Sequence, residues 1–172
     1  RSFAIPSIIA TLVSSLYNIV DQIFIGQGVG YLGNAATNVS YPLTTICLAL
    51  SLLIGIGSAS RFSLSLGAGE DDEAARVVGT GICMMIVFGV LYAVIIELFL
   101  YPMLNAFGAT SENLSYAAAY SRIIALGMPF QIITTSMSNL IRADGSPKYS
   151  MTCMLIGAIL NTILDPIFIF VF

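Results

Sequence analysis

The stretch Asn161-Thr-Ile-Leu-Asp-Pro-Ile-Phe-Ile-Phe170 places an amide and an acid inside an apolar run of membrane-spanning length. Residues four apart lie on one face of a helix, so Asn161 and Asp165 are expected to stand one above the other. Pro166 has no backbone N–H and leaves the carbonyl of Thr162 free as a further acceptor near the acid. Ionisable residues within membrane helices are costly and usually mark an ion or substrate pathway. The stretch therefore predicts a transmembrane helix that carries a polar site.

The composition of the whole chain agrees with a membrane protein. Hydrophobic residues make up 58% of the sequence, charged residues 9%, and the mean hydropathy is +0.95, which excludes an ordinary soluble domain. No run of basic residues is present, so nucleic acid is not an expected partner. The chain begins with Arg rather than Met and ends within an apolar run, so we expect residues 1–172 to be part of a longer protein.

Five segments are long and apolar enough to cross a hydrocarbon core, which needs roughly 20 residues per helix. They span about residues 5–25, 39–66, 76–104, 116–140 and 149–172. We expect an all-α, polytopic helix bundle, with a loop over 26–33 and a polar turn over 67–76. In that turn, Asp71 or Asp72 is expected to cap the following helix. Ser146 as N-cap and Pro147 as first helical residue are expected to open the fifth helix.

The first segment carries a second acid in a similar context, since Asp21-Gln-Ile-Phe-Ile parallels Asp165-Pro-Ile-Phe-Ile. Tyr17 lies one turn before Asp21 and can share its environment, and Pro6 either starts this helix or kinks it. The polar residues of the segment recur at helical spacing, which indicates a face turned toward protein or water; these residues are Ser7, Thr11, Ser14, Asn18 and Asp21.

The second and fourth segments carry patterns of a different kind. Ser51, Gly55, Ala59, Ser63 and Gly67 recur every fourth residue, which predicts close approach of another helix. The fourth segment is interrupted by Gly127 and Pro129, and the half beyond this kink is expected to border a wet cavity. Its polar face contains Gln131, Thr134, Thr135 and Ser138.

The distribution of basic residues predicts the orientation in the membrane. With a cytoplasmic N-terminus, the inner side holds five basic residues and the outer side only Arg122, as the positive-inside rule requires; the five are Arg1, Arg61, Arg76, Arg142 and Lys148. Helices one and five then run in the same direction, with Asp21 and Asp165 at equal depth in the outer half of the membrane. The same topology predicts that Glu97 and Arg122 face each other near the outer ends of helices three and four.

Four motifs, in order, resemble the multidrug and toxic compound extrusion (MATE) family: Leu16–Gly26, Leu66–Glu70, Ile141–Lys148 and Leu160–Phe168. The resemblance implies a chain of twelve helices in two six-helix lobes, of which residues 1–172 correspond to helices one to five of the N-terminal lobe. Helix six, which also lines the lobe's cavity, would be missing from this set.

The resemblance implies a multidrug efflux antiporter in the cell membrane, not an enzyme. Such a protein exports organic cations or amphipathic drugs in exchange for H⁺ or Na⁺, with no other cofactor. Its partners would be drug-like molecules, the lipid bilayer and the remaining helices of the same chain. The cation site, for a proton or Na⁺, would comprise Asp21, Asn161 and Asp165 with Tyr17 beside them. Further candidates are Asn18, Gln131, Thr135 and Thr162 as cavity lining, and Pro6, Pro129 and Pro166 as hinges.

Three alternatives remain open from the sequence. A lipid-linked precursor flippase of the same superfamily would be expected to have a cationic cavity for pyrophosphate. An intramembrane aspartyl protease also uses paired membrane aspartates, but neither Asp21 nor Asp165 lies in a Gly-x-Gly-Asp context. In the third alternative the acids only pair or cap within a scaffold, which does not explain a polar stripe leading to Asp21.

Overall fold

The computed structural model describes residues 4–28 and 30–170, and near the start of the first helix and the end of the last it describes the backbone but not every side chain. These residues form α1 (Ala4–Gly28), α2 (Tyr31–Gly67), α3 (Asp71–Ala106), α4 (Leu114–Ala143) and α5 (Pro147–Phe170). The helical bundle confirms the expected fold class. Of the described residues, those of α2, α3 and α4 form helices that are each long and apolar enough to cross a membrane.

The turns between helices are shorter than the sequence suggests. The expected loop over 26–33 is wrong, because α1 continues to Gly28 and α2 already begins at Tyr31. Gly30, with φ of 78° and ψ of −161°, adopts a backbone conformation that is essentially open to glycine alone, directly before α2 begins. The expected start of the fifth helix is confirmed, since Ser146 directly precedes Pro147, the first residue of α5.

The expected cap of the third helix is also wrong. Glu70 occupies the N-cap position of α3, without a side-chain capping hydrogen bond. Asp71, Asp72 and Glu73 instead fill the first turn of the helix. There, negative side chains favour the positive end of the helix dipole, so the acids still stabilise the helix start by charge rather than by a cap.

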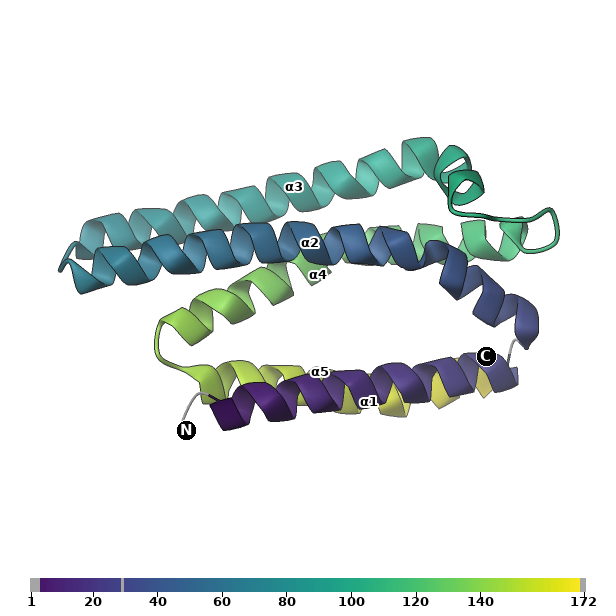
Figure 1. Cartoon of the computed structure of the whole chain (residues 1–172), viewed down its shortest axis with the longest axis horizontal. Coiled ribbons are helices and arrows are strands. Elements are labelled where there is room, and N and C mark those ends of the chain that lie inside the picture. The colour runs from purple at the N-terminus through teal and green to yellow at the C-terminus, as the bar shows by residue number, and fades with distance from the viewer. Residues whose placement is uncertain (1–3, 29, 171–172) are drawn as a thin grey trace.

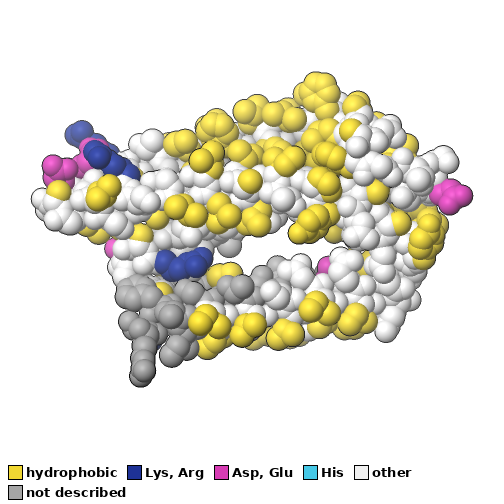
Figure 2. Space-filling model, in the orientation of Figure 1, with side chains coloured by type: hydrophobic (Ala, Val, Ile, Leu, Met, Phe, Trp, Pro, Cys, Tyr) yellow, Lys and Arg dark blue, Asp and Glu magenta, His cyan; other side chains and the backbone are white. Residues whose placement is uncertain are grey.

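The five helices form two groups (Figure 1). Helices α2, α3 and α4 pack on one another along much of their length, whereas α1 pairs with α5. The α1–α5 pair meets the other group mainly where the chain connects them, through α1 with α2 and α4 with α5. Figure 2 shows that side chains do not fill the space between the groups, so an opening separates them.

Helices α2 and α3 are longer than a membrane requires. They contain 37 and 36 residues, so each measures about 55 Å along its path at 1.5 Å per residue, against a hydrocarbon core of about 30 Å, although α3 is kinked at Phe99. Their joined ends project beyond the α4–α5 turn (Figure 1), and Arg and acidic side chains gather there (Figure 2). Arg61 and Glu73 form an ion pair across this hairpin at 3.3 Å. Elsewhere the helices expose many large apolar side chains, as a lipid-facing surface requires.

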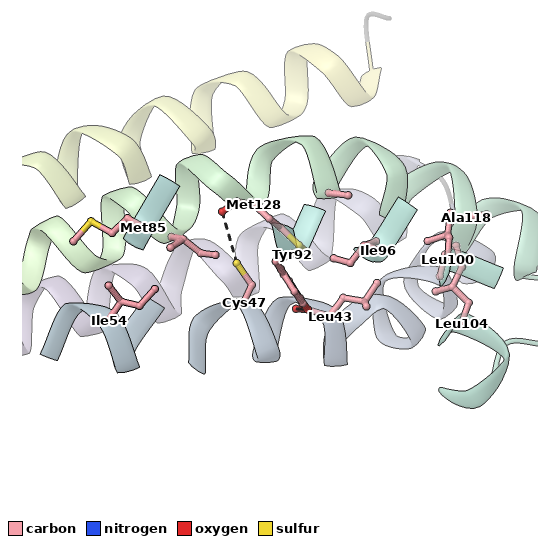
Figure 3. Close-up of a cluster of buried hydrophobic side chains, with 14 of the residues drawn as sticks. Leu43, Cys47, Ile54, Met85, Tyr92, Ile96, Leu100, Leu104, Ala118 and Met128 are labelled. Atoms are coloured by element: carbon pink, nitrogen blue, oxygen red, sulfur yellow. Dashed lines mark hydrogen bonds between the residues drawn. The ribbon is translucent and has the colours of Figure 1, made fainter. Parts of the chain in front are cut away.

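The core of the molecule lies within the α2–α3–α4 group (Figure 3). The Tyr92 hydroxyl of α3 donates to the Leu43 carbonyl of α2 at 2.7 Å. Cys47 Sγ of α2 donates to the Met128 carbonyl of α4 at 3.8 Å, as the dashed line in Figure 3 marks. Hydrogen bonds between helices partly replace the hydrophobic driving force that is weak within lipid. These contacts make the three helices one packed unit.

The small-residue stripe of α2 is used over only part of its length. Ser51 and Gly55 are buried against α4, and the Ser136 hydroxyl of α4 donates to the Ser51 carbonyl at 2.8 Å. The expectation of close packing is wrong for Ser63 and Gly67, which are exposed because this end of α2 extends beyond the α4–α5 turn.

The expected pairing of Glu97 with Arg122 is confirmed. Arg122 Nε of α4 lies 3.9 Å from Glu97 Oε2 of α3, and the guanidinium carbon lies 5.9 Å from the centre of the Tyr101 ring. The side chains of Arg122 and Glu97 are 56% and 40% exposed. The pair therefore joins the two helices at their surface, in reach of solvent.

Candidate functional site

The two helices that carry the candidate acids are neighbours. Figure 1 shows α1 and α5 side by side and running in the same direction, and they pack against each other. Asp21 lies 17 residues after the start of α1 and Asp165 lies 18 residues after the start of α5. At 1.5 Å per residue, both positions lie about 26–27 Å along their helices. The fold therefore brings the Asp21 and Asp165 positions to the same level of one helix pair.

Asp21 is half-buried, and its carboxylate lies close enough to Tyr120 of α4 to act on it electrostatically. Tyr120 is also half-buried. Asp21 therefore faces the opening between the two helix groups rather than the lipid surface. Tyr120 is not among the site residues that the sequence predicts. The signal available in the sequence was a similar depth in the membrane. Tyr120 lies six residues after the start of α4, and Asp21 lies seven residues before the end of α1.

On α5, Asn161 is half-buried and Thr162 is exposed. The Thr162 hydroxyl donates to the Ala158 carbonyl of its own helix at 2.9 Å, so its oxygen keeps lone pairs for an incoming donor. The side chains of Pro6, Tyr17, Asp165 and Pro166 lie outside the described residues, so the structure places only their backbone in α1 and α5. The proposed set of Asp21, Asn161 and Asp165 thus shares one helix pair.

The polar face expected on the second half of α4 is divided. Gln131 and Thr134 are exposed and Thr135 is half-buried, whereas Ser138 is buried and shares a hydrogen bond with Ser150 of α5. Ser138 therefore links the end of α4 to the start of α5 by a hydrogen bond and does not line a cavity. Gln131 and Thr135 are therefore not enclosed by the described helices.

Pro129 lies at a close contact between α4 and α3. A Cβ added to Gly89 of α3 would lie 2.9 Å from the Pro129 Cα, so α3 and α4 meet closely here. The second half of α4 leads toward the start of α5 (Figure 1). Proline in a helix interior removes one backbone hydrogen bond and favours a change of direction.

Near the end of α1 and the start of α2, amide side chains form a second polar region. The Thr37 hydroxyl of α2 lies 3.4 Å from Gln22 Oε1 of α1. Gly26 admits the Asn34 side chain, because a Cβ at residue 26 would lie 2.9 Å from Asn34 Nδ2. A groove of about 570 Å³ opens beside them, lined by Asn18, Ile19, Gln22, Ile23, Gly26 and Asn34.

Comparison with known proteins identifies the family that shares this architecture. The MatE family model matches residues 6–167. The chain is 33% identical over 172 residues to the multidrug export protein MepA of Staphylococcus haemolyticus, covering 98% of this chain and 37% of that protein. The chain thus spans less than two fifths of the length of this relative.

Solved structures agree with the sequence match. A crystal structure of MATE in complex with MaD3S superposes with a TM-score of 0.92 at 27% identity, over 98% of this chain and 38% of that one. A MOP superfamily transporter from Pyrococcus furiosus, described as having a binding pocket of reverse polarity, superposes with a TM-score of 0.91 at 27% identity over 98% and 37%. The family match over nearly the whole chain decides the assignment: the chain belongs to the MatE family of multidrug and toxic compound extrusion transporters.

Proposed function

We propose that residues 1–172 form the first five helices of the N-terminal lobe of a twelve-helix multidrug efflux antiporter. The complete protein would export organic cations or amphipathic drugs in exchange for H⁺ or Na⁺. The single observation that carries this proposal is the position of Asp21, half-buried beside the opening and on the partner helix of Asn161 and Asp165. A multidrug export protein among the relatives supports drug-like molecules as substrates and transport rather than enzymatic catalysis.

The proposed mechanism follows from the negative charge that Asp21 and Asp165 would supply at one level of the α1–α5 pair. A proton, Na⁺ or an organic cation each gains from the same carboxylates, and carboxylate and amide oxygens are suitable ligands for a hard cation. Binding of one cation therefore weakens binding of the other, and this antagonism is reciprocal. If the lobe exposes the site alternately to the two sides of the membrane, the exchange of drug for ion is antiport.

We further propose that the N-terminus is cytoplasmic. The α2–α3 and α4–α5 connections lie at one end of the molecule (Figure 1), and four of the five described basic residues lie at or near these connections; they are Arg61, Arg76, Arg142 and Lys148. Arg122 lies near the other end, on the first half of α4. The positive-inside rule then places the two basic connections in the cytoplasm, together with the start of α1.

Transport by the complete protein in proteoliposomes tests the function. Vesicles with a fluorescent organic cation would receive either a proton gradient or a Na⁺ gradient, each without the other. We expect one gradient to drive export of the dye and the dye to dissipate that gradient in return. Transport that neither gradient accelerates would contradict the antiport mechanism.

The flippase alternative has a distinct expectation. A lipid-linked pyrophosphate would require basic side chains at the site, whereas the described residues there are Asp21, Tyr120 and Asn161. Translocation of a fluorescent pyrophosphate-linked lipid by the same vesicles, without cation export, would favour the flippase over the drug antiporter.

A further inference from the structure

The Glu97–Arg122 pair on the surface of α3 and α4 has hydrogen-bonding capacity that the described chain does not use. Arg122 Nε and Glu97 Oε2 lie 3.9 Å apart, beyond hydrogen-bond distance, so the two groups attract each other by charge alone. Within the described residues, neither side chain forms a hydrogen bond with another part of the chain. The N–H donors of the guanidinium and the acceptor oxygens of the carboxylate therefore remain available to a molecule at this surface.

The pair lies near the boundary between the hydrocarbon and the headgroups of a membrane. Helix α4 has 30 residues and measures about 45 Å, which matches the 40–45 Å of a bilayer with its headgroups. Arg122 lies eight residues after the start of α4, about 12 Å from that end. Its side chain leans toward the same end, because the Cβ atoms of a helix tilt toward its N-terminus, and a long charged side chain extends in this way to reach the headgroups. Tyr101, beside the guanidinium, is of a residue type enriched at this level.

An exposed apolar strip extends from the pair toward the membrane interior. Val94 and Val90 lie one and two turns before the acid on α3, and Leu126 and Phe130 lie one and two turns after the arginine on α4. Both directions lead away from the α3–α4 connection. These four side chains are between 48% and 72% exposed. A charged pair with an apolar strip beneath it has the same order of polarity as a phospholipid, whose headgroup lies above its acyl chains.

We propose that the Glu97–Arg122 pair binds the headgroup of a phospholipid that carries both a phosphate and a primary ammonium. The planar guanidinium donates to the phosphate oxygens, and the carboxylate accepts hydrogen bonds from the ammonium. A headgroup with a phosphate and no cation would bring uncompensated negative charge beside Glu97, and a quaternary ammonium has no N–H to donate. The site therefore favours an aminophospholipid over anionic and choline phospholipids. The proposal does not depend on which ion or drug the complete protein transports.

The lipid, rather than a free headgroup, is the occupant because of the apolar strip. The strip offers surface that only acyl chains would cover, and burial of apolar area adds to the affinity. The two helices that carry it are each apolar and long enough to cross a membrane, so acyl chains lie against them in any case. The charged pair then selects which headgroup accompanies those chains.

Lipid binding to the complete, purified and delipidated protein tests the site. Native mass spectrometry would measure the Kd of the first bound molecule of phosphatidylethanolamine, phosphatidylcholine or phosphatidylglycerol, all with the same acyl chains. We expect phosphatidylethanolamine to bind most tightly. Glu97→Gln should raise its Kd about 3- to 10-fold, the loss of a hydrogen bond to a charged group, and should not weaken phosphatidylglycerol. Arg122→Gln should weaken all three lipids, because each carries a phosphate, and Arg122→Lys should retain part of that binding.

The other exposed ion pair of the described chain provides a matched control. Glu73→Gln removes the acid of the Arg61–Glu73 pair, which lies on the α2–α3 hairpin beyond the α4–α5 turn, and should change none of the three values. Equal weakening of every lipid by the Glu97 and Arg122 variants would overturn the proposal, since it would indicate a structural change rather than recognition of two charges. The unmodified protein decides the case in which a variant does not fold. If it binds phosphatidylethanolamine no more tightly than phosphatidylcholine, the proposed headgroup site is wrong.

Discussion

Gly55 of α2 and Ser136 of α4 lie in direct backbone contact: a Cβ added to Gly55 would lie 2.7 Å from the Ser136 Cα. Both residues are buried. The Ser136 hydroxyl bonds to the Ser51 carbonyl one turn away, so the close approach also allows a hydrogen bond between the two helices. Contact of this kind requires that one helix present no side chain.

Gly55→Ala should destabilise the three-helix group. The added methyl group would meet backbone rather than a flexible side chain, so α2 and α4 must separate, at a cost of about 1–3 kcal/mol. Thermal unfolding in detergent, followed by size-exclusion chromatography, measures the change. Gly57→Ala is the matched control, because a Cβ at Gly57 has nothing within 4 Å. An equal loss for the Gly57 variant would show that the effect is not caused by the α2–α4 contact.

The Glu97–Arg122 pair should contribute little to stability. Both side chains are exposed and their charged atoms lie 3.9 Å apart, a geometry typically worth about 0–1 kcal/mol. We expect Glu97→Gln and Arg122→Gln, alone or together, to leave transport unchanged and to shift the free energy of unfolding by no more than that amount. A loss of several kcal/mol in a double-mutant cycle would contradict this weak, solvent-screened coupling.

Tyr120 should take part in cation binding through its electrostatic interaction with Asp21. Tyr120→Phe removes the hydroxyl while keeping the ring, so we expect the apparent affinity for the coupling ion to fall about 3- to 10-fold. Tyr116→Phe, one turn earlier and exposed, is the control. The measurement is the rate of dye export against the concentration of the driving ion. Unchanged ion dependence in the Tyr120 variant would remove this residue from the site.

Asp21 and Asp165 should act as one unit. Two carboxylates in a poorly solvated site do not both ionise cheaply, so the first cation bound serves the pair. We expect Asp21→Asn, Asp165→Asn and the double variant to lose ion-coupled efflux to a similar extent while still inserting into the membrane. Asp144→Asn, in the exposed α4–α5 turn, should transport normally. Partial defects that add in the double variant would indicate independent carboxylates.

Much of this architecture is predictable from the sequence because the helices are surrounded by the hydrocarbon interior of a membrane rather than by water. A backbone that crosses a hydrocarbon core must satisfy its own hydrogen bonds, so long apolar segments predict helices without knowledge of their neighbours. The same segments make Asp21, Asn161 and Asp165 conspicuous, since polar residues are rare there. The Glu97–Arg122 contact also followed, because the two residues lie at the same depth on consecutive helices.

The helix ends and the partners of each helix depended on tertiary contacts. A single glycine conformation at Gly30 allowed α1 and α2 to extend through the expected loop, and turn composition does not reveal how few residues a reversal needs. Ser63 and Gly67 belong to the same stripe of small residues on α2 as Gly55, but Gly55 is buried and the other two are exposed. The stripe itself does not reveal how far along α2 the contact with α4 continues.

The pairing of α1 with α5, and the electrostatic effect of Asp21 on Tyr120, join residues far apart in the chain. Periodicity within one helix gives the face and depth of a side chain, but not which other helix lies against that face. That choice depends on how all five helices pack together, so only the tertiary structure decides it.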